Sequence, residues 1–172
     1  MRRNKRPAIP HFHGEEFLYR RVPLELWSDP GTPLGVNAIE LPDMSVGRSK
    51  FGHPEWLRID EVEGQLRHYD DWGVVGFRLQ DIPPERWDVG VFKYQFAARH
   101  MPEEWNYPHS EVQVSHDGRH LQLVDELPDE IHLLWREILL HTITVFLKPY
   151  QRAAIRQNAP VSFVPELPIP SE

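Results

Sequence analysis

The chain has 172 residues, of which 40% are hydrophobic and 26% charged, so it is long enough to bury the core of one globular domain. It contains no cysteine, which excludes thiol catalysis, cysteine-based zinc sites and disulfides. The net charge is −7 although four of the first six residues are basic, and such an acidic body argues against duplex nucleic acid as the main partner.

The two ends of the chain differ in composition from its middle. Residues 1–14 are expected to form a basic flexible arm, and residues 151–172 a proline-rich C-terminal tail. Residues 15–150 are expected to form a single domain. No apolar run reaches the roughly 20 residues of a membrane span, and no apolar segment typical of a secretory signal follows the basic start. We therefore expect a cytoplasmic protein without a membrane partner.

The first part of the domain contains several short predicted strands. Residues 17–22 and Met44–Val46 indicate brief strands, and a helical turn is expected near Pro54. Residues 72–79 are apolar on both sides and predict a buried strand. The alternating pattern that begins at Val89 predicts a strand of about ten residues.

The second part contains a predicted hairpin and the clearest helix. Asp117-Gly118 is a strong hairpin signal between two alternating segments. An apolar stripe at helical spacing indicates a helix after residue 128; its members are Ile131, Leu134, Trp135, Ile138 and Leu139. The β-branched segment 142–147 predicts a last strand. The whole pattern predicts an α+β fold, mostly an antiparallel sheet with one principal helix packed on it.

Tyr107, His109 and Glu111 are the first candidates for a functional site. Alternate residues of a strand share one face, so these three side chains are expected to lie side by side. A histidine beside a carboxylate and a phenol is suited to general acid–base catalysis. A solvated sheet face, where such residues are common, is the alternative interpretation.

Other polar residues suggest binding sites of several kinds. His116 and His120 flank the predicted turn and are expected to face one another, but two ligands are fewer than a zinc site generally uses. We therefore expect no metal and no cofactor. Ser45 with Arg48 suits an anion, unless the segment is a plain turn. Neighbouring side chains at Arg20 and Arg21 point to opposite faces, so one of the two is expected to be partly buried.

A buried arginine requires a carboxylate, for which Glu111 is a candidate. Tryptophan is enriched at binding hot spots, but packing against the core is the alternative role for such residues. The tryptophans near predicted turns are Trp27, Trp56, Trp72, Trp87 and Trp105.

Four short motifs occur in the order FLYRRVP, LPDMSV, WGVVGF and NYPHSEV. This order resembles a pattern in small uncharacterised bacterial proteins of multi-gene systems, of the conflict or mobile-element type. The resemblance covers residues 17–115. It implies a component of a multi-protein system and no established activity.

The layout also resembles that of mono-ADP-ribosyltransferases, which carry an Arg or His on an early strand, a Ser or Tyr on a middle strand and a Glu on a late one. Arg20, Ser45 and Glu111 are the matching positions. The sequence departs from that family because it has no Ser-Thr-Ser run and because Glu111 lacks the Glu/Gln-x-Glu setting.

Two functions follow from these observations. The first is an interaction or accessory protein of a bacterial multi-component system that binds a partner protein. The alternative is an enzyme that acts on a nucleotide-like substrate, for which ADP-ribosyltransferase-like chemistry is one option. Its expected catalytic residues are His109, Glu111, Tyr107, Arg20 and Ser45.

Overall fold

The computed structural model describes residues 11–27, 41–62, 65–101, 109–123 and 126–151. Most of the expected arm and nearly all of the expected tail lie outside these ranges, as do Trp105 and Tyr107. Residues 11–14, which the sequence assigns to the arm, contact the domain, because the side chain of Phe12 packs against the main core.

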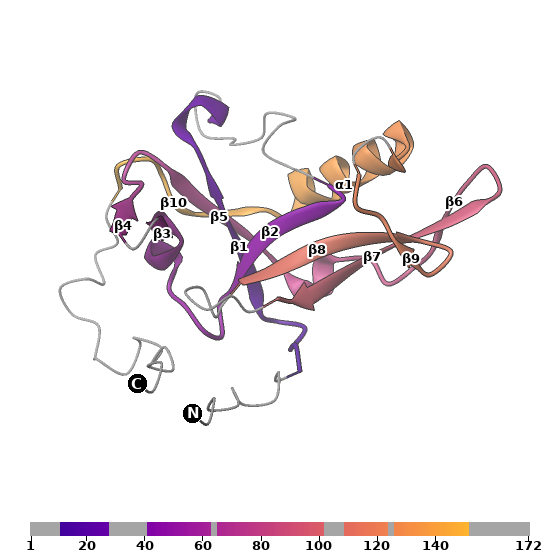
Figure 1. Cartoon of the computed structure of the whole chain (residues 1–172), viewed down its shortest axis with the longest axis horizontal. Coiled ribbons are helices and arrows are strands. Elements are labelled where there is room, and N and C mark those ends of the chain that lie inside the picture. Colours follow the sequence, from indigo (N-terminus) through magenta and orange to yellow (C-terminus); the bar gives the residue numbers. More distant parts are fainter. Residues whose placement is uncertain (1–10, 28–40, 63–64, 102–108, 124–125, 152–172) are drawn as a thin grey trace.

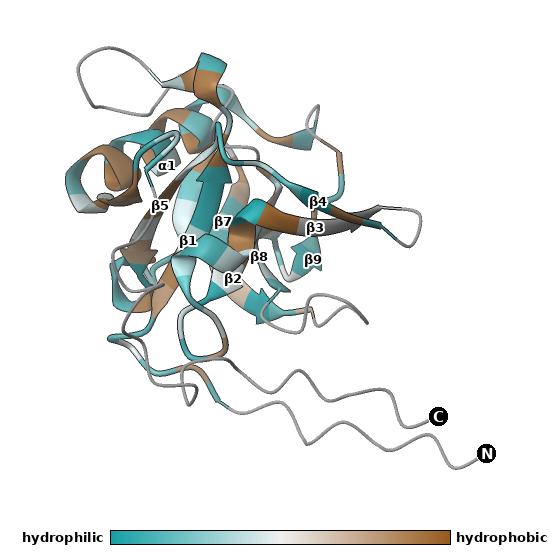
Figure 2. Ribbon diagram, turned by 90° about the vertical axis from the view of Figure 1, so that its left-hand side faces the viewer, coloured by the Kyte–Doolittle hydropathy of each residue, from teal (hydrophilic) through white to brown (hydrophobic). Residues whose placement is uncertain are grey.

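An antiparallel sheet dominates the described part of the chain (Figure 1). In sheet order, its strands are β10 (Thr144–Leu147), β5 (Gly73–Arg78), β1 (Phe17–Val22), β2 (Asp43–Arg48), β8 (His109–His116), β7 (Phe92–His100) and β6 (Trp87–Val89). A short eighth strand, β9 (Arg119–His120), pairs with β8. Strands β3 (Ile59–Val62) and β4 (Gln65–His68) form a separate hairpin that projects from the side of the sheet (Figure 2).

Helix α1 (Asp129–Thr142) covers one face of the sheet and closes the main core. Its buried residues are Ile131, Trp135 and Leu139, which recur at helical spacing. The ring of Trp135 lies between those of Phe77 and Phe96, with centroids 5.7 Å and 5.0 Å away. This packing places the helix over the middle of the sheet. In the described part of the chain, no helix is long and apolar enough to cross a membrane.

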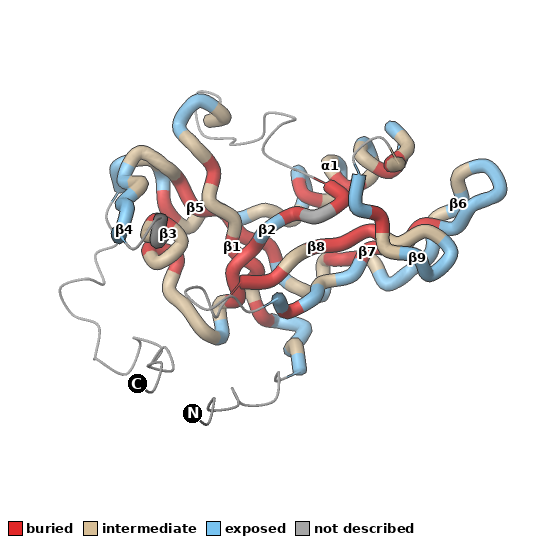
Figure 3. The backbone as a smooth tube through the Cα atoms, in the orientation of Figure 1, coloured by how far each residue is buried: buried red, intermediate tan, exposed pale blue. Residues whose placement is uncertain are grey.

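The opposite face of the sheet is only partly covered. A small apolar cluster lies over strands β10, β5 and β1, and includes Tyr19, Val74 and Leu147. Leu57, from the 3-10 helix Pro54–Arg58, packs against this cluster. Buried residues are concentrated in the central strands, and exposed residues are concentrated around β4 and β6 (Figure 3). On the part of this face formed by β2, β8 and β7, the residues Ser45, Ala97 and Arg99 are exposed, and we call this part the open part of the sheet.

The predicted α+β layout is confirmed, including the principal helix and the hairpin turn at Asp117-Gly118. The strand of about ten residues expected from Val89 is found as the nine-residue β7, but its expected start is wrong, because a turn at Gly90 and Val91 separates β6 from β7. Gly90 has a φ of +62°, a left-handed conformation that glycine adopts without strain. The hairpin of β3 and β4 has no counterpart among the predicted elements.

Candidate functional site

The side chains of β8 divide between the two faces of the sheet as the alternation predicts. Ser110, Val112 and Val114 lie on the face that α1 covers, where the two valines join the main core. His109 and Glu111 lie on the opposite face, at its open part. The strand therefore carries an apolar and a polar side, and the polar side is the first place to seek chemistry.

His109 makes a hydrogen bond with Ser45 of the neighbouring strand β2. The histidine Nε2 lies 3.1 Å from Ser45 Oγ. In the register of the two strands, His109 is opposite Gly47 and Ser45 is opposite Glu111, so the serine is the diagonal neighbour of the histidine. Because Gly47 has no side chain, no Cβ stands directly opposite the imidazole ring.

A second hydrogen bond fixes the tautomer of the His109 ring. Nδ1 lies 2.7 Å from the carbonyl oxygen of Met101. A carbonyl oxygen only accepts, so Nδ1 carries the proton and, in the neutral ring, Nε2 carries the lone pair. The hydroxyl of Ser45 therefore donates to Nε2. His109 is 8% exposed, whereas Ser45 is an exposed residue, so the base is held inside and the hydroxyl faces solvent.

Glu111 lies beside this pair and is held by its own strand. Its Oε2 accepts a hydrogen bond of 2.8 Å from Nε2 of Gln113. Arg99 of β7 is opposite Glu111 in the register and is exposed. The open face thus presents a hydroxyl, an imidazole, a carboxylate and a guanidinium from three adjacent strands.

Arg20 contacts the backbone of Ser45. Its Nη1 donates to the carbonyl oxygen of Ser45 at 2.9 Å. Strands β1 and β2 pair at Leu18 and Tyr19, before Arg20, so the guanidinium takes the place of the next ladder bond. The side chains of Ser45, His109 and Glu111 thus lie together, whereas the alternation of β1 places Arg20 on the other face with Leu18 and Val22. The fifth predicted site residue, Tyr107, is outside the described residues. The nucleotide-like substrate stays a prediction.

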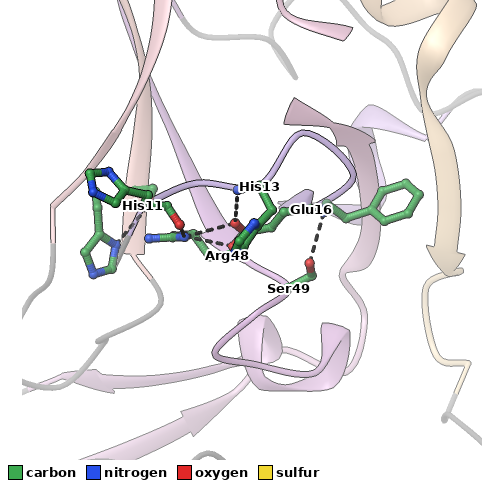
Figure 4. Close-up of polar contacts among 8 residues, drawn as sticks. His11, His13, Glu16, Arg48 and Ser49 are labelled. Carbon is green, nitrogen blue, oxygen red and sulfur yellow. Dashed lines mark hydrogen bonds and ion pairs between the residues drawn. The ribbon is translucent and has the colours of Figure 1, made fainter. Parts of the chain in front are cut away.

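A buried ion pair at one end of the sheet was not anticipated from the sequence. Arg48 donates from Nε to Glu16 Oε1 at 2.8 Å and from Nη2 to Glu16 Oε2 at 2.9 Å, and both side chains are buried (Figure 4). The guanidinium also lies over the rings of Phe12 and Phe51. Positions 45 and 48 of one strand point to opposite faces, so Ser45 and Arg48 do not form the anion site that the sequence suggests.

A second serine–histidine contact lies next to this ion pair, inside the core. His100 Nδ1 and Ser110 Oγ are 3.2 Å apart, and both residues are buried. Burial lowers the pKa of His100, and the charge of Arg48 lowers it further, while Glu16 raises it in part. This ring is therefore kept neutral by its surroundings. Because side chains alternate along β8, Ser110 points to the face that α1 covers, whereas His109 points to the open face.

The predicted meeting of His116 and His120 is wrong. Asp117 and Gly118 form a two-residue loop, so the flanking residues His116 and Arg119 are paired. His120 is opposite Ser115, and the two histidines therefore point to opposite faces of the sheet. Among the described residues, no three His, Asp or Glu side chains are grouped so that they could hold a metal ion.

The described tryptophans at turns are half-buried rather than exposed. Trp27 donates from Nε1 to the carbonyl oxygen of Val22 at 3.0 Å. Trp72 packs against Tyr69, and the guanidinium of Arg21 lies over both rings. Trp56 and Trp87 have the same intermediate exposure. Trp27 and Trp87 also pack against the main core. A role of these tryptophans in partner binding stays a prediction.

The buried arginine with a carboxylate partner is Arg48, which pairs with Glu16. The pairing of Glu111 with Arg20 or Arg21 stays a prediction. Arg20 and Arg21 are both half-buried, whereas only one of the two was expected to be partly buried. Comparison with known proteins finds no family model, no curated protein and no solved structure that matches this chain.

Proposed function

We propose that the protein is an interaction or accessory component that binds a partner protein through the outer face of α1. The observation that carries this proposal is the exposure of Leu133 and Leu140, which are 62% and 46% exposed. Seven residues correspond to two helical turns, so these leucines lie on one line along the helix. Isolated exposed leucines are common, but aligned ones form a strip that a partner can cover.

Charged residues accompany this strip. Glu130 and Glu137 recur with the two leucines at helical spacing, so that glutamate and leucine alternate along the same side of α1. The apolar residues would pack in a groove of the partner, while the glutamates would meet basic side chains at its rim. The proposal therefore specifies a partner with an apolar groove flanked by lysine or arginine.

The bacterial multi-gene setting and the cytoplasmic location belong to the same proposal. They are supported by the order of the four motifs between residues 17 and 115 and by the absence of cysteine.

The test is native mass spectrometry of the tagged chain, isolated from the cells that make it. We expect a complex of fixed stoichiometry that is lost when Leu133→Glu and Leu140→Glu are combined. Leu66→Glu is the matched control, because Leu66 is 68% exposed and lies on the separate β3–β4 hairpin. A chain that is always found alone, or a complex that the control disrupts equally, would contradict the proposal.

A further inference from the structure

We propose that Ser45 is a nucleophile activated by His109, and that this site accepts acyl groups from uncharged esters. The site lies on the open face of the sheet, and α1 covers the other face. This inference is therefore independent of partner binding through α1. The two side chains of this site are distant in sequence and meet because β2 and β8 are neighbours in the sheet.

The pair meets the geometric requirements of an activated hydroxyl. A serine nucleophile needs a base within hydrogen-bonding distance, and the base needs a third group that orients it. Here Nε2 of His109 lies 3.1 Å from Ser45 Oγ, and the Met101 carbonyl oxygen lies 2.7 Å from Nδ1. The carbonyl plays the orienting part that a carboxylate plays in a catalytic triad, because it holds the proton on Nδ1.

The charges around Ser45 favour an uncharged substrate. Glu111 is directly opposite Ser45, and Cβ atoms of such pairs are about 4.5–5.5 Å apart. A carboxylate on the residue directly opposite Ser45 repels the oxygens of a phosphate ester but not a neutral carboxylic ester.

The reaction step is a simple acyl transfer. The proton of Ser45 Oγ moves to His109 Nε2 as Oγ forms a bond to the carbonyl carbon of the ester. The bond between that carbon and the ester oxygen then breaks, and the proton on Nε2 passes to the departing alkoxide. The products are an alcohol and an acyl ester of Ser45, which water hydrolyses with His109 again acting as the base.

The chain contains a natural comparison for this pair. Ser110 lies 3.2 Å from a histidine nitrogen of His100, but it is 0% exposed. The same two residue types are in contact at both places, and only Ser45 can meet a reagent from solvent. Reactivity that depends on both the contact and the exposure should therefore appear at Ser45 and not at Ser110.

The first test uses the absence of natural cysteines, which makes Ser45→Cys the only thiol of the full-length chain. A thiol beside a histidine base is deprotonated more readily, so its reaction with a disulfide reagent such as dithionitrobenzoate is faster. Ala97→Cys is the matched control, because Ala97 is exposed on the same face of β7, opposite Gln113. We expect the Ser45→Cys thiol to react about tenfold faster or more at neutral pH. Equal rates would overturn the proposal.

The second test measures the native serine with p-nitrophenyl acetate, followed by mass spectrometric mapping of the acetyl group. We expect acetylation of Ser45 with release of p-nitrophenolate, a loss of about 10²–10⁴-fold in rate in His109→Gln, and no change in Ser110→Ala. Circular dichroism shows whether the His109→Gln variant is folded, and the thiol comparison tests the activation of position 45 without that variant. No acetylation of Ser45 in the wild-type chain, or acetylation that His109→Gln leaves unchanged, would contradict the assignment.

Discussion

The guanidinium of Arg48 is the most deeply buried charge in the described part of the chain, and Glu16 supplies its countercharge. Replacing Glu16 with glutamine keeps the shape of the side chain but removes the countercharge. We expect Glu16→Gln to lower the free energy of unfolding by about 3–5 kcal/mol, because a buried charge is left uncompensated. Urea denaturation monitored by circular dichroism measures this change.

The exposed pair Asp88 and Lys93 is the control for this measurement. Its atoms are 3.7 Å apart at the surface, and exposed pairs of this kind contribute about 0–1 kcal/mol. Asp88→Asn should therefore change the free energy of unfolding little. Glu16→Leu combined with Arg48→Met should cost less than Glu16→Gln alone, since no charge remains buried. A loss at Glu16→Gln no larger than that at Asp88→Asn would show that the ion pair does not hold this end of the sheet.

His100 makes the stability depend on pH. Its pKa in the folded protein is lowered, mainly by burial and then by Arg48, so the unfolded chain takes up a proton at a higher pH than the folded protein does. The free energy of unfolding should therefore be highest above pH 6.5 and should fall as the pH is lowered through and below that value. His132 acts in the same direction, because burial also lowers its pKa.

The measurement is urea denaturation between pH 7.5 and pH 5, with His100→Asn for comparison. The variant should show a smaller loss of stability on acidification, because one buried neutral histidine is missing. A variant whose stability falls as steeply as that of the wild-type chain would assign the effect to other groups.

At the scale of the elements, α1 is attached to the sheet chiefly by Trp135. This side chain is fully buried between Phe77 and Phe96. We expect Trp135→Ala to lower the free energy of unfolding by about 3–5 kcal/mol, because it leaves a cavity under the helix. Leu133→Ala, on the outer face of the same helix, should cost less than about 0.5 kcal/mol apart from helix propensity. Equal costs in urea denaturation would mean that α1 is not anchored by its inner face.

Local patterns predicted those elements whose residues alternate or recur without interruption. The stripe of α1 and the Asp117-Gly118 turn are of this kind, since spacing or turn chemistry alone specifies them. The break between β6 and β7 escaped prediction because Val89 and Val91 continue the alternation through the turn at Gly90. A glycine with positive φ inside such a pattern is visible only in the backbone.

At the scale of the whole molecule, the sequence predicted which residues of β8 share the face of the candidate site, but it did not predict their contact with Ser45. The period of two placed His109 and Glu111 on a common face. The contact of His109 with Ser45 depends on the register between β2 and β8, and it joins positions 64 residues apart. Glu16 and Arg48 were missed for the same reason, because they are 32 residues apart and meet only after the strands pair.

The two proposed functional surfaces lie on opposite sides of the sheet. The leucine strip belongs to the outside of α1, and Ser45 belongs to the open part of the opposite sheet face. Leu133→Glu combined with Leu140→Glu should therefore leave the reactivity of the Ser45→Cys thiol unchanged. Loss of partner binding and loss of the activated hydroxyl are thus independent results.

The measurement that tests the central claim most directly is the tautomer of His109 in the wild-type protein. Long-range ¹H–¹⁵N correlation spectra of a sample labelled at histidine distinguish a protonated ring nitrogen from an unprotonated one, and His109→Gln assigns the signals. At a pH where the ring is neutral, we expect the proton on Nδ1 and the lone pair on Nε2. A proton on Nε2 would contradict the account, because that nitrogen could then only donate to Ser45 and could not act as its base.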